Sequence, residues 1–174
     1  MISTSHVTRV AGTFTRLLEM LRPDLLRFAY WLARDRQVAE DVVQETLIRA
    51  WKAGEELRDL SAVRPWLFTI ARREYARLFE RKRLPTVDID DAEAIGDPAL
   101  ATDGDSGLLD LRRAIMKLPD EYREPLVMQV LGGLSTAEIA KELGLTQAAV
   151  LTRLFRARNR LRTIYGLEPA EEAE

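Results

Sequence analysis

The stretch at residues 134–162 constrains the fold of this chain more than any other. Its pattern predicts a helix, a tight turn and a second helix. Ser135 is a favourable N-cap residue, and Glu138 three residues later completes a capping box. Gly144 suits the turn because glycine readily adopts the positive φ that ends a helix. Thr146 can then cap the second helix. The segment is therefore expected to form two helices joined by a short, fixed turn.

The second of these helices has one apolar side and one side suited to DNA. The opposite side from the core carries a small residue, a hydroxyl, an aromatic ring, a guanidinium and an amide, which are groups that reach base edges and phosphates in a major groove. An ordinary hairpin with a solvated arginine face is the alternative, but the cap, the glycine and the basic helix together favour DNA binding. The apolar side is Val150, Leu154, Ala157 and Leu161, the polar side is Ala148, Thr152, Phe155, Arg156 and Asn159, and the surrounding arginines are Arg153, Arg158, Arg160 and Arg162.

Composition excludes several functional classes. The 174 residues include no cysteine, which rules out disulfides, thiol catalysis and cysteine-ligated zinc and suits a reducing cytoplasm. The single histidine, His6, lies in a polar N-terminal segment, and no apolar run reaches membrane-spanning length. No catalytic constellation or phosphate-binding glycine loop is visible. We therefore expect a soluble cytoplasmic protein that is not an enzyme and needs no cofactor or metal.

Acidic residues are concentrated in two segments, which explains a formal net charge of −2 in a chain with basic helices. Residues 85–107 contain seven Asp and Glu residues and no Lys or Arg, and residues 166–174 contain four more acids. The first segment lacks a hydrophobic period and is predicted to be a flexible linker, and the second an acidic tail. The rest of the chain is basic, as expected for a nucleic-acid-binding protein.

Before the linker, hydrophobic spacing predicts a helical domain at residues 13–84, preceded by a disordered tail at 1–12. Pro23 is expected to divide the apolar stretch from Phe14 to Arg34 into two helices, since proline suits a first turn rather than a helix interior. A turn at 34–36 then leads to a helix at 37–52, and a polar loop at 54–63 leads to a helix at 64–84. After the linker, residues 108–165 are predicted to form a four-helix domain. The expected fold is all-α, with two small helical domains.

Two helical faces of the first domain have more than one interpretation. The helix at 37–52 has an outer polar stripe with one isoleucine, which could bind a protein, although a solvated face is more common and is favoured by the pattern alone. The helix at 64–84 carries several arginines, with Trp66 and Phe68 near its start. Arginines beside aromatic rings can hold single-stranded DNA, but Trp66 is equally expected as a core residue. The outer stripe is Asp41, Gln44, Glu45, Ile48 and Lys52, and the arginines are Arg72, Arg73, Arg77 and Arg83.

Four motifs resemble those of a known family. They are AEDVVQETLIRAWK at 39–52, RPWLFTIARREYARLFERKR at 64–83, LPDEYREPLVMQ at 118–129 and GLSTAEIAKELGLTQAAVLTRLFRARNRLR at 133–162. On these motifs, the chain resembles a two-domain extracytoplasmic-function (ECF) sigma factor of the bacterial sigma-70 family. The resemblance implies a protein that binds core RNA polymerase and directs it to promoter DNA. It also implies that an anti-sigma factor holds the protein inactive.

The resemblance assigns a role to each domain. Residues 13–84 would be similar to sigma region 2, which binds core polymerase and opens the −10 element. Its loop at 54–63 would capture a flipped base of the non-template strand, because the edges of that base are hidden in the duplex. Residues 108–165 would be similar to region 4, which reads the −35 element.

The resemblance also implies which residues form each site. It implies that the stripe at 41–52, which the pattern alone suggested is a solvated face, binds core polymerase. Two positions depart from the family's usual pattern: Leu151, where Lys or Arg is frequent, and Arg73, where Asn is common. These departures affect the promoter sequence rather than the class. The expected core polymerase-binding residues are Asp41, Gln44, Glu45, Ile48 and Arg49; the −10 residues are Leu57, Arg58, Trp66, Thr69, Arg72, Arg73 and Arg77; the −35 residues are Leu151, Thr152, Arg153, Phe155, Arg156 and Asn159.

Two other functions are compatible with parts of the sequence. A stand-alone helix-turn-helix regulator would bind duplex DNA without polymerase, and it would leave the motifs at 39–83 unexplained. A helical adaptor that mimics a sigma factor would bind only proteins, and it would support no promoter-specific transcription.

Overall fold

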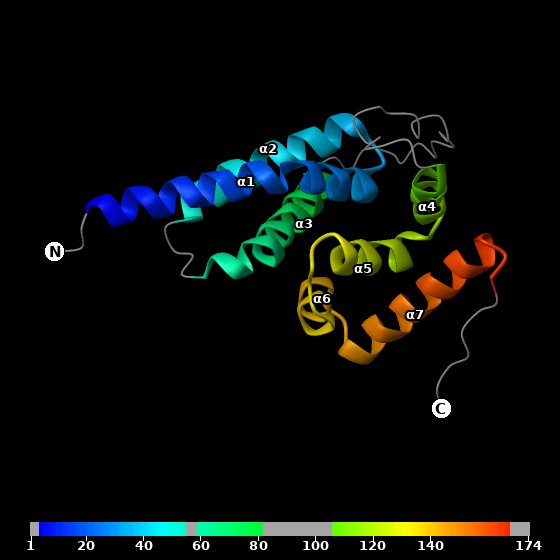
Figure 1. Ribbon diagram of the computed structural model, residues 1–174. Helices are drawn as coiled ribbons and strands as arrows, with labels where there is room; N and C mark the ends of the chain where they lie inside the picture. The colour runs from blue at the N-terminus through cyan, green and yellow to red at the C-terminus, as the bar shows by residue number, and fades with distance from the viewer. Residues whose placement is uncertain (1–3, 55–58, 82–105, 168–174) are drawn as a thin grey trace.

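The computed structural model describes residues 4–54, 59–81 and 106–167, and Figure 1 shows these ranges as helices joined by short turns. No strand occurs within them, which confirms the all-α prediction. The predicted linker and acidic tail lie mostly outside the described residues. The elements are α1 (Thr4–Ala33), α2 (Arg36–Ala53), the short 3-10 helix η2 (Leu60–Ala62), α3 (Val63–Arg81), α4 (Ser106–Met116), α5 (Asp120–Val130), α6 (Thr136–Leu143) and α7 (Gln147–Ile164).

Helix α1 differs in two ways from the sequence-based expectation. It begins at Thr4, so most of the segment expected to be a disordered tail is helical, since extending an existing helix needs no new nucleus. Pro23 lies inside α1 and does not divide it, which corrects the expectation of two helices. An interior proline costs about 3 kcal/mol. Pro23 faces solvent, however, and the buried Leu18 and Leu25 on either side of it keep both halves packed on the core, at about 1.5–3 kcal/mol for each leucine.

The turn between α1 and α2 consists of residues 34 and 35, within the segment 34–36 that was predicted. Arg34 adopts a positive φ of 55°, which is uncommon for a residue other than glycine. Asp35 then caps α2, because its Oδ1 accepts a hydrogen bond from the Val38 amide at 2.8 Å. The Arg34 side chain leaves the turn toward the second domain and donates to the carbonyl oxygens of Met116 and Leu118 at 3.1 and 3.3 Å. A turn residue of the first domain therefore contacts the second.

The first domain packs α1, α2 and α3 around a common core. The rings of Phe28 in α1 and Phe68 in α3 meet edge to face, with centroids 5.0 Å apart. Phe68 is fully buried, so it cannot stack on a DNA base, which corrects its suggested place beside the basic face of this helix. The buried face of α2 consists of Ala39, Val42, Val43, Thr46 and Ala50.

The second domain consists of α4 to α7, as predicted. The face of α7 that packs on the domain is buried at Val150, Leu154 and Ala157. Two arginines of α7 also contact α5. Arg160 lies over the ring of Tyr122 at 4.8 Å from its centroid, and Arg158 donates to Gln129 Oε1 at 2.5 Å. Helix α5 is thus held to α7 by polar as well as apolar contacts.

The two domains pack against each other through α5. Figure 1 shows α5 between the helices of the first domain and α7. The buried apolar residues of both domains form one continuous cluster rather than two separate cores. Gly132, which follows α5, approaches α3 so closely that a Cβ atom at this position would lie 3.2 Å from Cβ of Phe68. The sequence indicated two domains, and the structure brings them together.

Candidate nucleic-acid interface

The turn before α7 has the geometry that its sequence predicted. The Ser135 amide donates to Glu138 Oε2 at 2.7 Å, and the Glu138 amide donates to Ser135 Oγ at 3.2 Å, which completes the capping box. The Ser135 hydroxyl also donates to Glu138 Oε2 at 2.7 Å, and this hydrogen bond, together with the one from the Ser135 amide, lowers the pKa of Glu138 from its ordinary value. Gly144 ends α6 with φ 64°, and Thr146 Oγ1 accepts from the Ala149 amide at 3.1 Å. The direction in which α7 leaves the turn is therefore fixed at both ends.

Helix α7 exposes three of the six residues expected to contact DNA. Leu151, Thr152 and Arg156 are exposed, and the other three, Arg153, Phe155 and Asn159, are partly buried. The Thr152 hydroxyl donates to the Ala148 carbonyl at 3.0 Å, which leaves its oxygen able to accept. In the parts of the chain that the structure describes, Arg156 has no carboxylate partner. A guanidinium in this position can bind a base edge or a phosphate without first breaking an ion pair.

The outer face of α2 is exposed at the positions expected to bind polymerase. Asp41 and Gln44 face solvent, and Ile48 is 42% exposed. Trp51, one turn further along and next to this stripe, is 59% exposed, which is unusual for so large an apolar side chain. Trp51 was not among the residues expected from the sequence, although its spacing of three residues from Ile48 was a usable signal. The face therefore combines two polar side chains with an exposed apolar pair.

Glu74 connects this α2 face to the basic face of α3. It was not among the residues expected from the sequence to belong to a site. It is 5% exposed, forms an ion pair with Arg49 of α2 at 2.9 Å and accepts a hydrogen bond from Arg77 of α3 at 2.9 Å. Arg49 also pairs with Glu45 at 3.0 Å. The position of Glu74 between two arginines is a tertiary arrangement, and hydrophobic spacing carries no signal for it. One buried carboxylate thus orients an arginine on each of two candidate interfaces.

The candidate −10 residues of α3 differ in their exposure and in the groups that they contact. Trp66 is partly buried and packs on Phe14 at 6.2 Å between ring centroids, and Thr69 is partly buried. Arg77 is half exposed and paired with Glu74. The guanidinium groups of Arg72 and Arg73 are held by acids of the second domain, Glu124 and Glu142 respectively. Leu57 and Arg58 lie outside the described residues, while Asp59, which follows them, caps η2 by accepting from the Ser61 amide at 2.9 Å.

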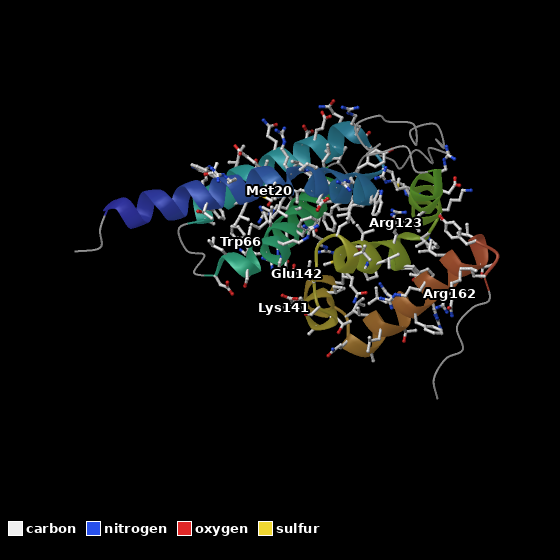
Figure 2. The ribbon with its side chains drawn as sticks, viewed as in Figure 1. Met20, Trp66, Arg123, Lys141, Glu142 and Arg162 are labelled. Carbon is white, nitrogen blue, oxygen red and sulfur yellow. The ribbon has the colours of Figure 1, made fainter. Side chains whose placement is uncertain are left out.

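Arg123 of α5 is another residue that was not singled out from the sequence. It is 2% exposed and donates to the carbonyl oxygens of Trp31 and Leu118 at 2.7 and 3.0 Å and to Asp120 at 2.6 Å. Burial is the main cause of the lowered pKa of its guanidinium. Burying a charged guanidinium is costly unless its N–H donors are hydrogen-bonded. Arg123 therefore fixes α5 against the end of α1, as Figure 2 shows.

The described residues lack two kinds of feature. Among them there is no group of three or more His, Asp or Glu side chains arranged to hold a metal ion. None of the helices in these ranges has the length and apolar character needed to cross a bilayer.

Comparison with known families identifies both domains. Residues 17–84 match the family model of sigma-70 region 2, and residues 108–161 match that of sigma-70 region 4. Among curated proteins, the chain is 32% identical over 160 residues to the ECF RNA polymerase sigma factor SigM of Bacillus subtilis, covering 88% of this chain and 95% of that one. It is 36% identical over 143 residues to the ECF sigma factor SigL of Mycobacterium tuberculosis, covering 79% and 80% of the two chains.

Two solved structures share the fold of this chain. The sigma factor RpoE of Bartonella quintana, in complex with the anti-sigma factor NepR, matches 88% of this chain with a TM-score of 0.65 and 29% identity, and 97% of that chain is covered. CnrH, in complex with the cytosolic domain of CnrY, matches 91% of this chain and 94% of its own with a TM-score of 0.51 and 23% identity, which shows the fold.

These comparisons do not favour the stand-alone regulator or the protein adaptor. The match to region 2 accounts for the motifs at 39–83, which a regulator with a helix-turn-helix alone leaves unexplained. Curated relatives that are sigma factors over nearly their whole length account for both domains together. Sigma factors are not themselves enzymes. The chain belongs to the ECF sigma factors of the sigma-70 family, which direct RNA polymerase to promoters.

Proposed function

We propose that three helical faces divide the work of promoter recognition in this sigma factor. The outer face of α2 binds core RNA polymerase, α3 with the loop before it binds the non-template strand of the −10 element, and α7 reads the −35 element in duplex DNA. One observation carries this proposal: the three faces lie on three different helices. The faces of α2 and α7 are exposed to solvent. Each face also has the chemistry of its ligand.

The −35 assignment is supported by the geometry of α7. A helix-turn-helix places its second helix in the major groove, with residues of its N-terminal half against the base edges. Thr152 and Arg156 are exposed on that side, and Arg156 is available for a bidentate contact to a guanine. Leu151 is exposed beside them and can contact a thymine methyl group, so the chain is expected to prefer a different base where relatives have Lys or Arg.

The polymerase assignment is supported by the mixed character of α2. An exposed stripe with an acid, an amide and two apolar side chains resembles the centre of a protein interface more than a solvated face. Asp41 and Gln44 supply polar contacts, and Ile48 with Trp51 supplies apolar area to bury. Trp51 is thereby added to the residues expected from the sequence.

The −10 assignment depends on α3 and the loop at 54–63. Arg72, Arg73 and Arg77 bind backbone phosphates of the unpaired strand, and Trp66 and Thr69 border the path of its bases. Leu57 and Arg58 of the loop are proposed to contact a flipped base. Two weak DNA-binding domains gain affinity when both are fixed on one surface, and core polymerase provides that surface.

An anti-sigma factor is proposed as a further partner, and the cytoplasm as the compartment. RpoE of Bartonella quintana, which is similar to this chain over both domains, was solved in complex with an anti-sigma factor. A protein of that class is expected to bind this chain and to block its association with core polymerase.

Run-off transcription with purified core polymerase and a library of randomised promoters tests the proposed function. The chain is expected to enrich promoters with two conserved elements separated by the −10 to −35 spacing. A variant with Leu151→Arg is the matched control, because it should change the enriched bases of the −35 element and leave those of the −10 element unchanged. If core polymerase initiates no better with the chain than without it, the proposal is wrong.

A further inference from the structure

The first residues of the two helices of the helix-turn-helix are joined by a hydrogen bond between their side chains. Gln147, which begins α7, donates from Nε2 to Oγ1 of Thr136, which begins α6, at 2.8 Å. Figure 1 shows α6 beside the start of α7. Gln147 is exposed, and it was not among the residues expected to contact DNA. The hydrogen bond therefore orients an exposed amide at the start of the helix that is proposed to read the −35 element.

Gln147 keeps the two groups that the edge of an adenine requires. A glutamine amide has two N–H donors and one carbonyl oxygen. One N–H is used on Thr136, and among the described residues the other N–H and Oε1 make no further hydrogen bond. In the major groove adenine presents the N7 acceptor and the N6 amino donor, and a glutamine amide can bind both at once. The remaining N–H and Oε1 are the donor and the acceptor that this contact uses.

The first turn of α7 can approach DNA closely. Ala148 and Ala149 follow Gln147, and Ala148 is exposed, so no large side chain at these positions holds the helix away from the base edges. Helix α7 contains no Asp or Glu residue, which would repel the phosphates beside the groove. Side chains three or four residues apart on a helix in the major groove contact neighbouring bases, as in zinc fingers. This spacing sets Gln147 opposite the base pair next to the one assigned to Leu151.

The backbone on both sides of the hydrogen bond is fixed by other contacts. Thr136 follows Ser135, whose capping box with Glu138 sets the first turn of α6. Gln147 follows Thr146, which caps the first turn of α7. The bond between Thr136 and Gln147 is thus not needed to place the helices, and its effect is to select one orientation of the glutamine amide.

We propose that Gln147 is a specificity-determining residue of this chain, which reads an adenine at one edge of the −35 element and is held in the reading orientation by Thr136. This inference rests on the proposed −35 role of α7. Thr136 acts through Gln147 and is a positioning residue. Ordering a flexible side chain before binding lowers the entropy that is lost in the complex, which is worth about two- to tenfold in affinity.

The test measures the preferred base at each position of the −35 element by run-off transcription with core polymerase and a library randomised across that element. With the unaltered chain, one edge position should prefer adenine. Gln147→Ala should reduce this preference at least about fivefold and leave the preferences at the other positions unchanged. Gln147→Glu should move the preference to cytosine, because a carboxylate accepts from the N4 amino group. Gln147 is exposed, so both variants are expected to fold.

The positioning role of Thr136 is tested in the same assay. Thr136→Val removes the hydroxyl and nearly keeps the shape of the side chain, and it should weaken the adenine preference at least about twofold. Thr136→Ser keeps the hydroxyl and should restore most of the preference. The matched control is Thr163→Val, which removes an exposed hydroxyl at the other end of α7, where Thr163 donates to the Asn159 carbonyl at 3.1 Å. The control should leave every −35 preference unchanged.

The base preferences separate the inference from its rivals. Equal loss of transcription from all promoters in the Gln147→Ala chain would indicate a phosphate contact or a purely structural bond, and it would overturn the inference. Unchanged preferences in both Gln147 variants would overturn it as well, and so would a preferred base other than adenine at the position that they affect. Failure of the proposed function has a different signature, since the unaltered chain would then enrich no −35 element with core polymerase.

Discussion

The guanidinium of Arg123 in α5 donates from Nε to the carbonyl oxygen of Trp31 in α1 at 2.7 Å, across the boundary between the two domains. The same side chain also donates to the Leu118 carbonyl in the turn between α4 and α5 of its own domain. Both carbonyl groups lie near helix ends, where backbone oxygens lack intrahelical partners. Arg123 therefore satisfies backbone groups of two domains with one buried charge, and it links the stability of the domains to their mutual position.

Replacing Arg123 with leucine is expected to destabilise the chain by about 2–5 kcal/mol, because the Trp31 carbonyl would lose this donor and the Leu118 carbonyl would keep only the longer hydrogen bond from Arg34. Urea unfolding measures this change. The control is Arg113→Leu, since Arg113 is exposed and, among the described residues, forms an ion pair only with Asp110, and its loss should change the stability by less than about 0.5 kcal/mol. Equal stabilities of the two variants would show that Arg123 is not the link described.

Replacing Arg156 with alanine is expected to reduce binding to the −35 element by about 1–3 kcal/mol and to relax specificity at one base pair. The reason is that its guanidinium is exposed on α7 without a carboxylate partner among the described residues. Run-off transcription on a set of promoters with single substitutions in the −35 element measures the change. Arg113→Ala removes the same charge from α4 and should leave promoter choice as it is. An Arg156→Ala protein with unaltered base preferences would exclude the base-reading role.

The double replacement Asp41→Ala/Gln44→Ala is expected to weaken binding to core polymerase by at least about tenfold, or about 1.4 kcal/mol. Both side chains are exposed, so circular dichroism should show an intact fold. Affinity for core polymerase is measured by surface plasmon resonance, with Glu19→Ala/Glu121→Ala as the control on two other helices. Undiminished affinity of the α2 variant would place the docking face elsewhere.

Replacing Ser135 with alanine is expected to destabilise the helix-turn-helix by about 1 kcal/mol at neutral pH through loss of the cap. The hydrogen bonds with Ser135 lower the pKa of Glu138 below its ordinary value of 4.5. A carboxylate with a lowered pKa in the folded state stabilises the protein above that ordinary value, and the contribution is lost as the pH falls through the lowered pKa. The difference in unfolding free energy between wild type and Ser135→Ala should therefore shrink below pH 4.5, as measured by urea unfolding across a pH series. A difference that stays constant or grows with acid would contradict the role of Glu138.

Much of this protein follows from local sequence. The caps at Ser135 and Thr146 and the left-handed Gly144 depend on interactions within a few residues, so the sequence was sufficient to place the turn before α7. The exposed stripe of α2 follows from helical periodicity in the same way. The family resemblance rests on contiguous motifs, and these were also visible in the sequence.

The tertiary structure decided what depends on residues far apart in the chain. Pro23 stays inside α1 because packing on both sides outweighs a local propensity. Glu74, Glu124, Glu142 and Arg123 are charged residues whose partners lie on other helices, and neither hydrophobic spacing nor a local motif indicates them. The sequence by itself determined the helices of both domains and the exposed faces of α2 and α7, since short-range hydrogen bonds and periodic burial specify these. Only the tertiary structure showed that one domain covers the arginines of the other, because that depends on which charged groups meet when two separate surfaces pack.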